Sequence, residues 1–258
     1  MAKTALITGA SSGIGTELAK YHAGKGGDVI LTARRTDALK ALKSEIEEKY
    51  EVKAHVFSAD LAKSGAADKL YEDVKKAGLE VEILINNAGF GGRGIHIERD
   101  LDRELGMIEL NVKSLVTLTH RFGQDMATRG NGKILNVGST AGFMPGPQQA
   151  IYFATKAFVN SYSQAVDQEL RDRGVTCTVL APGYVKTEFA EVADLDGTKL
   201  VSARGAEAKD VAREGYIGMR AGELVSFNDG MLKFMLNWLL PLMPRRLVLW
   251  AVDRAQRK

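Results

Sequence analysis

The sequence has little cysteine: a single residue, Cys177, in 258. One cysteine cannot form a disulfide within the chain, and this one lies in the apolar run 175–180, which is typical of a buried strand. We therefore expect Cys177 to be a small core residue. The histidines show no spacing typical of metal ligands, so no metal site is predicted; they are His22, His55, His96 and His120.

Charge of one sign is also lacking, because 35 Lys and Arg nearly balance 32 Asp and Glu, for a net charge of +3. This balance gives no overall field that would favour nucleic acid or an anionic membrane, so any basic patch must be local, and nucleic acid is not expected as a partner. A charged segment followed by an apolar signal sequence is missing as well, since a strand-like run already occupies residues 4–8. We expect a cytoplasmic protein in a reducing environment.

What the sequence does contain is an alternation of short β-rich runs with segments of helical period, at 45% hydrophobic residues. This alternation predicts an α/β fold, a doubly wound, mostly parallel sheet with helices on both faces, Rossmann-like, in a single domain over residues 1–258. The expected strands are 4–8, 29–32, 52–57, 81–85, 133–137 and 175–180, and the expected helices are 37–50, 64–77, 108–129, 149–173 and 206–219.

A glycine-rich turn, from Thr8 to Gly15, separates the first strand from a helix. Gly9 permits a sharp turn, Gly13 lets the backbone approach a pyrophosphate, and Gly15 allows close packing of the helix. The free N–H groups at the start of that helix favour an anion. The spacing G-x-x-x-G-x-G differs from the G-x-G-x-x-G of ordinary dinucleotide-binding folds.

Read as T-G-x-x-x-G-I-G, this turn resembles that of the short-chain dehydrogenase/reductase family. Further motifs agree in the same order over roughly the first three-quarters of the chain. They are Asn86-Asn87-Ala88-Gly89, Asn111, Ser139, Tyr152-Phe153-Ala154-Thr155-Lys156 and Pro182-Gly183-Tyr184-Val185-Lys186-Thr187.

The resemblance implies a catalytic role for four residues. Tyr152 would be the acid/base, Ser139 would hold the substrate oxygen, and Asn111 would support a proton relay. Lys156 would assist Tyr152 and bond the nicotinamide ribose. The implied cofactor-binding residues are Gly9, Ser11, Ser12, Gly13, Ile14, Gly15, Arg34, Arg35, Asp60, Asn87, Ala88, Gly89, Tyr152, Lys156, Pro182, Gly183, Val185 and Thr187.

The four-residue spacing of Tyr152 and Lys156 places both side chains on one face of a helix. An ammonium about 5 Å from a phenol contributes roughly 3 kcal/mol at an effective dielectric of about 20, or on the order of two pKa units. We therefore expect Lys156 to lower the pKa of Tyr152 towards neutrality, where the phenol can act as acid or base.

The cofactor preference follows from the end of the second strand. An NAD-specific fold usually has a carboxylate there, but this chain has Ala33 followed by Arg34 and Arg35. Two guanidinium groups suit a 2′-phosphate, which predicts NADP(H) over NAD(H). Asp60 matches an adenine-contacting aspartate of the family, although a turn or helix-cap role is an equal contender.

The loop 141–147 would line the substrate side of the cleft, together with Ser139 and Tyr152. Its Phe143 and Met144 favour an apolar substrate, although both side chains could instead anchor the loop. Residues 183–230, with scattered glycines and charges, are expected to form a substrate loop region over the site.

Residues 231–258, here called the carboxyl-terminal segment, form an apolar extension whose part 231–250 is interrupted too often for a transmembrane helix. Three placements stay open for 231–250: a subunit interface or pocket cover, contact with a membrane surface, or plain core. Pro241 and Pro244 should break the segment into two helical pieces. A homodimer or homotetramer is expected.

Together these features predict an NADP(H)-dependent oxidoreductase that interconverts a carbonyl and an alcohol on a moderately lipophilic small molecule. Two alternatives keep the fold without the chemistry, namely a nucleotide-sensing protein and a lipid-binding protein at a membrane surface. The complete Ser139, Tyr152 and Lys156 set argues against the first alternative, and only the segment 231–250 supports the second.

Overall fold

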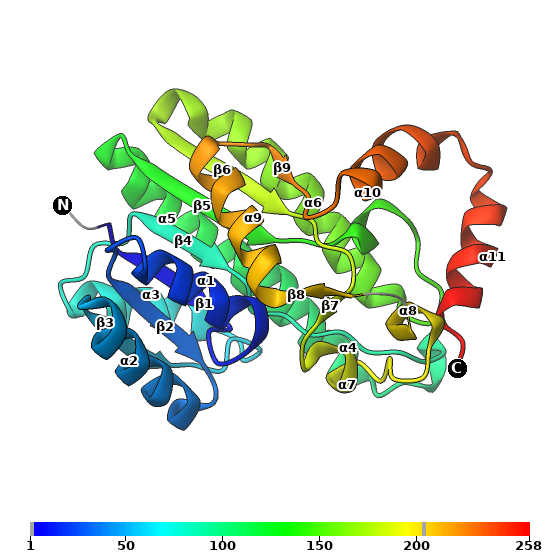
Figure 1. The fold of residues 1–258 in the computed structure, drawn as a ribbon, viewed down its shortest axis with the longest axis horizontal. Helices are drawn as coiled ribbons and strands as arrows, with labels where there is room; N and C mark the ends of the chain where they lie inside the picture. Colours follow the sequence, from blue (N-terminus) through cyan, green and yellow to red (C-terminus); the bar gives the residue numbers. More distant parts are fainter. Residues whose placement is uncertain (1–2, 203–204) are drawn as a thin grey trace.

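Seven parallel strands form the central sheet of the computed structural model, which describes residues 3–202 and 205–258 (Figure 1). They are β1 (Ala5–Thr8), β2 (Val29–Ala33), β3 (Ala54–Ser58), β4 (Ile83–Asn86), β5 (Gly132–Val137), β6 (Val175–Leu180) and β9 (Val225–Ser226). Their order is β3-β2-β1-β4-β5-β6-β9, so the chain reverses its direction of travel across the sheet between β1 and β4. A second sheet pairs β7 (Val185–Lys186) with β8 (Ala206–Glu207).

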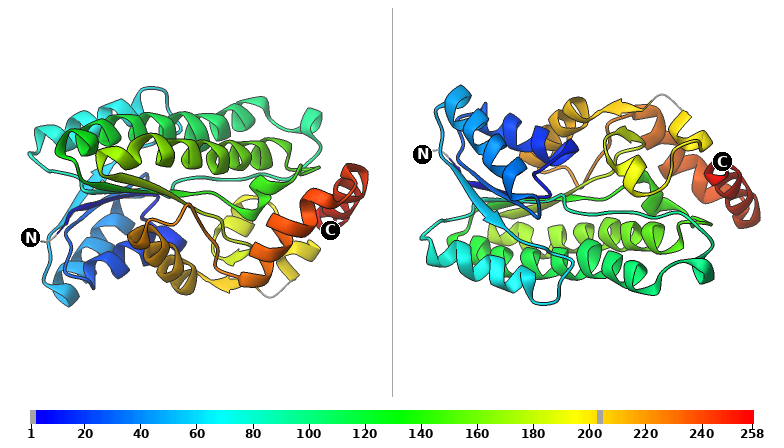
Figure 2. Two further views of the ribbon diagram at one scale, coloured as in Figure 1. Left: turned by 90° about the horizontal axis from the view of Figure 1, so that it is seen from above. Right: turned by 90° about the horizontal axis from the view of Figure 1, so that it is seen from below.

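Helices cover both faces of the sheet, which confirms the predicted doubly wound fold (Figure 2). One layer holds α1 (Gly13–Ala23), α2 (Thr36–Tyr50) and α9 (Ala208–Ala221), and the other holds α3 (Ala66–Lys76), α5 (Leu115–Arg129) and α6 (Ala150–Leu170). The shorter helices are η1 (His96–Glu98), α4 (Leu101–Ile108), η3 (Thr140–Phe143), η4 (Arg171–Arg173), α7 (Phe189–Val192) and α8 (Lys199–Ser202).

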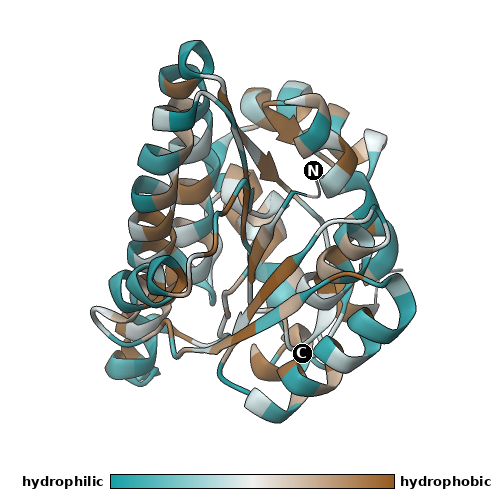
Figure 3. Ribbon diagram, turned by 90° about the vertical axis from the view of Figure 1, so that its left-hand side faces the viewer, coloured by the Kyte–Doolittle hydropathy of each residue, from teal (hydrophilic) through white to brown (hydrophobic). Residues whose placement is uncertain are grey.

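The strands are apolar on both sides because alternate residues enter two different cores. In β1, Ile7 belongs to the cluster under α1, α2 and α9, and Leu6 belongs to the cluster under α3 and α5. Figure 3 shows the sheet in brown between helices whose outer turns are teal. Cys177 is fully buried in the second cluster, as predicted.

The expected helix 108–129 begins with an irregular turn. A π-helical turn, η2 (Glu109–Ser114), lies between α4 and α5, and the helix α4 was not predicted. A π turn adds a residue to the helical repeat and is frequent at functional sites. Asn111 lies within this turn.

The region 183–230 is only partly a loop over the site. Helix α9 packs on α1 and β6, and β9 adds a seventh strand beside β6. The Tyr216 hydroxyl on α9 lies 2.8 Å from His22 Nδ1 on α1, both side chains being buried. The helix predicted at 206–219 is thus present as α9, but residues 208–226 pack on the main sheet, which corrects the expectation that they form part of a loop region over the site.

The carboxyl-terminal segment forms two helical pieces, as predicted. The first runs through α10 (Gly230–Phe234), η5 (Met235–Leu239) and η6 (Leu240–Leu242), and the second is α11 (Arg245–Gln256). Pro244 is the cap residue that precedes α11, and Pro241 lies in the 3-10 turn η6. Among the described residues, no helix has the length and apolar character needed to span a bilayer.

Candidate active site

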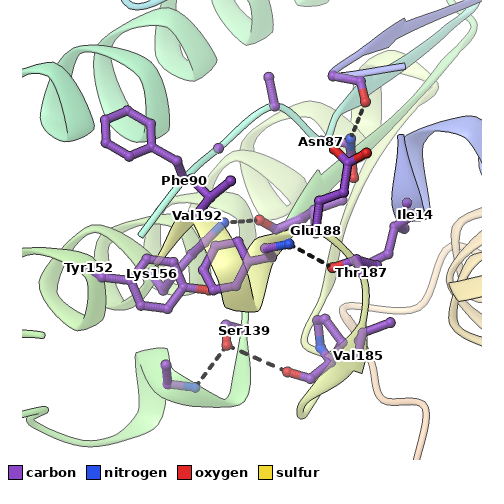
Figure 4. Close-up of a pocket in the computed structure, with 18 of the residues that line it drawn as sticks. Ile14, Asn87, Phe90, Ser139, Tyr152, Lys156, Val185, Thr187, Glu188 and Val192 are labelled. Atoms are coloured by element: carbon purple, nitrogen blue, oxygen red, sulfur yellow. Dashed lines mark hydrogen bonds between the residues drawn. The ribbon is translucent and has the colours of Figure 1, made fainter. Parts of the chain in front are cut away.

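A cavity of about 680 Å³ opens at the carboxyl ends of the sheet strands (Figure 4). Ligands of open α/β sheets bind at this edge, where the strand order reverses. Most of the predicted site residues line the cavity: Gly9, Ser11, Ser12, Gly13, Ile14, Arg34, Arg35, Asp60, Asn87, Ala88, Gly89, Ser139, Met144, Tyr152, Lys156, Pro182, Gly183, Val185 and Thr187. Three others, Gly15, Asn111 and Phe143, are not among its lining residues.

The glycine turn has the shape that a diphosphate requires. Gly9 and Gly13 have φ values of +66° and +56°, which favour glycine, and a Cβ on Gly13 would lie 2.9 Å from Thr187 Cγ2. A Cβ on Gly15 would collide with the carbonyl oxygen of Gly9, so Gly15 serves packing under the turn. No side chain caps α1 at Ser12, which leaves its first N–H groups free for an anion.

The residues that directly follow β4 hold this glycine turn in place by hydrogen bonds. The Asn87 side chain donates from Nδ2 to the carbonyl oxygens of Thr8, at 2.9 Å, and of Gly9, at 3.2 Å. The Thr8 hydroxyl accepts from the backbone N–H groups of Asn87 and Ala88, both at 3.0 Å. These bonds hold the turn open towards the cavity, so its residues fit a dinucleotide phosphate.

Tyr152 and Lys156 enter the cavity from α6, and Ser139 enters from the end of β5 (Figure 4). The Lys156 ammonium donates to the carbonyl oxygen of Val137 at 2.7 Å and lies 5.8 Å from the centre of the Tyr152 ring. The backbone N–H of Ala141 donates to Ser139 Oγ at 3.1 Å, which orients the hydroxyl. The three side chains thus converge on one part of the cavity.

Burial determines the pKa values of Tyr152 and Lys156. Burial raises the pKa of Tyr152 to about 12, against an opposing hydrogen bond from Ser139, and burial lowers the pKa of Lys156 to about 8. We expected Lys156 to bring the pKa of Tyr152 towards neutrality, and the structure corrects this. Removing both groups from water disfavours their charged forms. At neutral pH, Tyr152 is therefore a protonated phenol.

Asn111 lies one layer behind the cavity wall. Its Nδ2 donates to the carbonyl oxygen of Phe90 at 3.0 Å and to Thr155 Oγ1 at 3.2 Å, while its Oδ1 accepts from the N–H of Phe90 at 3.1 Å. A Cβ placed on Gly89 would lie 3.0 Å from Asn111 Oδ1 and 3.7 Å from Lys156 Nζ. The π turn η2 thus brings Asn111 close to Lys156.

Arg34 and Arg35 lie at the lip of the cavity, at the start of α2. Arg35 forms an ion pair with Glu188 at 2.8 Å and donates to Ser11 Oγ at 3.3 Å. The hydrogen bond from Arg35 lowers the pKa of Glu188 below its usual value. Glu188 was not predicted as a site residue, because only the fold brings it to a residue 153 positions away.

The substrate side of the cavity differs from the expectation at one residue. Met144 lines the cavity, whereas the Phe143 ring packs against Phe227 at 5.6 Å between centroids, so Phe143 anchors its loop instead of facing the substrate. Apolar residues that the sequence did not point out complete this wall: Phe90, Phe189, Val192, Leu195, Ala251, Val252 and Ala255.

Helix α11 is fixed against this wall by hydrogen bonds near the start of α6. Gln149 Nε2, at the start of α6, donates to Gln256 Oε1 at 2.7 Å in a buried contact. Beside it, Gln148 Nε2 donates to Asp253 Oδ1 at 2.8 Å. The helical spacing of Val252, Ala255 and Gln256 marks a shared face in the sequence, but only the fold shows that this face meets the cavity.

A parallel sheet that presents a glycine turn, a buried serine and lysine and a half-buried tyrosine at its carboxyl edge is the architecture of a dinucleotide-binding oxidoreductase. The family profile described as short chain dehydrogenase matches residues 3–196. The chain belongs to the short-chain dehydrogenase/reductase family.

Similar proteins include the very-long-chain 3-oxoacyl-CoA reductase of Homo sapiens, 35% identical over 192 residues, with 73% of this chain and 61% of that protein covered. The chain thus spans about three-fifths of the length of this relative. A short-chain dehydrogenase from Sphingobium yanoikuyae in complex with NADPH is 30% identical, with a TM-score of 0.85 over 93% of this chain and 92% of that one. The bulky-bulky ketone specific alcohol dehydrogenase from Comamonas testosteroni is 27% identical, with a TM-score of 0.77 over 94% and 95% of the two chains.

Proposed function

We propose that this protein is an NADP(H)-dependent oxidoreductase that interconverts a carbonyl and a primary or secondary alcohol. The observation that carries the proposal is the convergence of Ser139, Tyr152 and Lys156 in one cavity with the glycine turn. A nicotinamide dinucleotide bound there would supply or accept the hydride at the substrate carbon. The glycine turn and Thr187 would hold its diphosphate, and Lys156 its nicotinamide ribose.

In the reductive direction, Ser139 and Tyr152 bind the carbonyl oxygen through their hydroxyl groups and orient the carbonyl. Tyr152, protonated because burial raises its pKa to about 12, donates its proton to that oxygen as negative charge develops there. The oxygen becomes a hydroxyl group and Tyr152 becomes a phenolate. The Lys156 ammonium, held by the carbonyl of Val137, stabilises this phenolate.

Reprotonation of Tyr152 needs a route to water. We propose that Asn111, which lies close to Lys156 behind Gly89, supports a proton relay that connects Tyr152 to water through Lys156. Its Oδ1 and Nδ2 are held by the backbone of Phe90, so its orientation is fixed. In the oxidative direction the same groups act in reverse, with Tyr152 as the base.

The preference for NADP(H) over NAD(H) rests on the lip of the cavity. Ala33 offers no carboxylate to the ribose hydroxyls, and Arg34 and Arg35 line the cavity at the start of α2, where a 2′-phosphate would be neutralised. The similar short-chain dehydrogenase from Sphingobium yanoikuyae was solved with NADPH. We also propose that Asp60, which lines the cavity, contacts the adenine.

The substrate is proposed to be a moderately lipophilic small molecule. Phe90, Met144, Phe189 and Val252 give the cavity an apolar wall beyond Tyr152, which suits hydrocarbon or ring substituents on the carbonyl. Similar proteins named for very-long-chain 3-oxoacyl-CoA and for bulky-bulky ketones are consistent with this proposal.

Self-association as a homodimer or homotetramer, and a cytoplasmic location, belong to the same proposal. Ile97, in η1, is 88% exposed, Leu101, at the start of α4, is 64% exposed, and Leu105 one turn later is exposed too. A second subunit on this apolar surface would remove it from water. Light scattering on the purified chain measures the mass of the assembly.

Replacing Tyr152 tests the reaction. Tyr152→Phe removes the hydroxyl group that binds the carbonyl oxygen and donates the proton, so we expect turnover of a panel of ketones with NADPH to fall to below a few per cent while cofactor affinity stays within a few-fold. Lys156→Met, the contrasting variant, should reduce both turnover and cofactor affinity. Substantial ketone reduction by Tyr152→Phe would show that another group donates the proton.

A further inference from the structure

The carboxyl-terminal segment presents an unusually apolar outer surface. Of the seventeen large apolar side chains that are exposed in the described residues, nine lie between positions 231 and 250. A soluble monomer rarely leaves so many large apolar side chains together in water. They are Met231, Phe234, Met235, Trp238, Leu239, Leu242, Met243, Leu247 and Trp250.

This exposure is a property of one face and does not come from a segment that fails to pack. In α11, Val248 and Gln256 are buried, while Leu247 and Trp250 are exposed on the other side. The bond between Gln149 and Gln256 holds the inner face on the cavity wall. Figures 1 and 2 show α10 and α11 at the end of the molecule opposite the amino terminus.

Positive charge is concentrated on the same segment. Residues 231–258 contain six basic residues and one acidic residue, whereas the other 230 residues contain 29 basic and 31 acidic ones. Arg245 and Arg246 are exposed and form no ion pair within residues 3–202 and 205–258. The positively charged part of the chain therefore stands beside its most apolar surface, while the rest of the chain is slightly acidic.

We propose that this face docks on an anionic phospholipid surface, with α10 and α11 lying in the plane of the interface. Exposed apolar side chains flanked by arginine and tryptophan are the composition of interfacial helices. A two-fold contact between copies would instead place this basic segment against itself, and like charges would oppose it. Anionic headgroups neutralise the arginines while the lipid boundary takes up the apolar side chains.

Tryptophan fluorescence can report this docking without an added label. The chain has two tryptophans, Trp238 and Trp250, which are 69% and 60% exposed on the proposed face. The full-length chain is mixed with vesicles of phosphatidylcholine alone or of phosphatidylcholine with about one-third phosphatidylglycerol. We expect the tryptophan emission to shift to shorter wavelength, and the protein to sediment, with the anionic vesicles only. High salt should reverse part of the binding.

Substitutions separate the contribution of the arginine charges to vesicle binding from that of the exposed apolar side chains. Arg245→Gln with Arg246→Gln should weaken binding to anionic vesicles by about tenfold or more. The matched control, Lys40→Gln with Lys49→Gln on the distant helix α2, removes the same charge and should leave binding unchanged. Trp238→Ala with Leu242→Ala removes two exposed apolar side chains and should also weaken sedimentation, without changing the circular dichroism of the folded chain.

Three results would overturn the proposal. One is unchanged emission and full recovery of the protein in the supernatant with anionic vesicles. Another is an equal loss of binding in the arginine variant and in its α2 control. The third is a protein that ignores vesicles but whose mass in light scattering falls in Trp238→Ala with Leu242→Ala, because the face would then bind a second copy. None of these measurements depends on turnover, so they test membrane docking independently of the proposed oxidoreductase activity.

Discussion

At the scale of single residues, Lys156 has an unusual environment for a charged group. Lys156 is only 6% exposed, and its ammonium donates to the carbonyl oxygen of Val137. Burial lowers its pKa to about 8, so the ammonium loses its proton within the range where enzymes are assayed. The charge that stabilises a Tyr152 phenolate is therefore present below about pH 8 and lost above it.

This pKa predicts the pH dependence of carbonyl reduction. Because Lys156 is protonated below its pKa of about 8, kcat/KM for a ketone should be highest on the acidic side and fall as the pH rises through that value. Steady-state rates with saturating NADPH, measured in overlapping buffers, give the profile. A rate that stays level from about pH 7 to about pH 9.5 would contradict the proposed role of the Lys156 charge.

Arg35 and Glu188 form a second residue-scale feature, an exposed ion pair across the lip of the cavity. A bound 2′-phosphate would compete with the Glu188 carboxylate for Arg35 and be repelled by it. Glu188→Gln should therefore tighten NADPH binding several-fold and leave NADH binding nearly unchanged. Arg34→Gln with Arg35→Gln should weaken NADPH binding by roughly 2 to 4 kcal/mol.

Fluorescence titration with NADPH and NADH measures both affinities of each variant. If the two cofactors lose affinity equally in the double arginine variant, the substitutions damage the fold and the arginines do not select the phosphate. Unchanged NADPH affinity in Glu188→Gln would mean that Glu188 swings away from the cofactor at no cost.

At the scale of elements, α11 matters because it is a wall of the substrate cavity held by a few polar contacts. Gln256 is 2% exposed, and its Oε1 accepts from Gln149 Nε2 at 2.7 Å. Tyr152 follows Gln149 by three positions in the chain. The position of α11 is thus coupled to the beginning of the catalytic helix.

Gln256→Ala should weaken the attachment of α11 to the start of α6. Leaving a buried amide without its partner costs about 1 to 3 kcal/mol, so we expect the melting temperature to fall and KM for a lipophilic ketone to rise. The affinity for NADPH, which the glycine turn determines, should change little. Arg257→Ala, which removes only the exposed pair with Asp253, is the control. Equal kinetic effects of the two substitutions would argue against a specific role for Gln256.

At the scale of the whole molecule, the seven-stranded sheet and the carboxyl-terminal segment are separate in composition and position. None of the seven strands of the main sheet comes from residues 231–258. Both major apolar clusters are likewise built from residues before Gly230. The sheet, the glycine turn and the catalytic side chains therefore have their own packing.

Deleting residues 231–258 should leave a folded chain that binds NADPH with an affinity within a few-fold of the full-length protein. The loss of Val252 and Ala255 opens the cavity, so KM for a lipophilic ketone should rise by about tenfold or more. Circular dichroism, NADPH titration and steady-state kinetics measure the three properties. A truncated protein with normal KM would show that α11 contributes nothing to the substrate site.

The amino-acid sequence alone was enough to predict the architecture and to point out most of the side chains that line the cavity. Strands such as β1 are local apolar runs, and the glycine turn and the Tyr152/Lys156 spacing are local patterns, so each can be recognised without the fold. The break in the carboxyl-terminal segment was predictable for the same reason, since Pro244 acts on its own backbone.

Features that depend on contacts between distant segments follow only from the folded structure. The two-residue strand β9 carries too little local signal to be predicted, and the helical pattern of α9 does not show that it packs on α1 and β6. The partner of Arg35, the direction of the Phe143 ring and the wall formed by α11 likewise come from pairs far apart in the chain. The pKa of Tyr152 also depends on the fold, because the surrounding packing removes its phenol from water. The four-residue spacing in the sequence indicated only the attraction of Lys156.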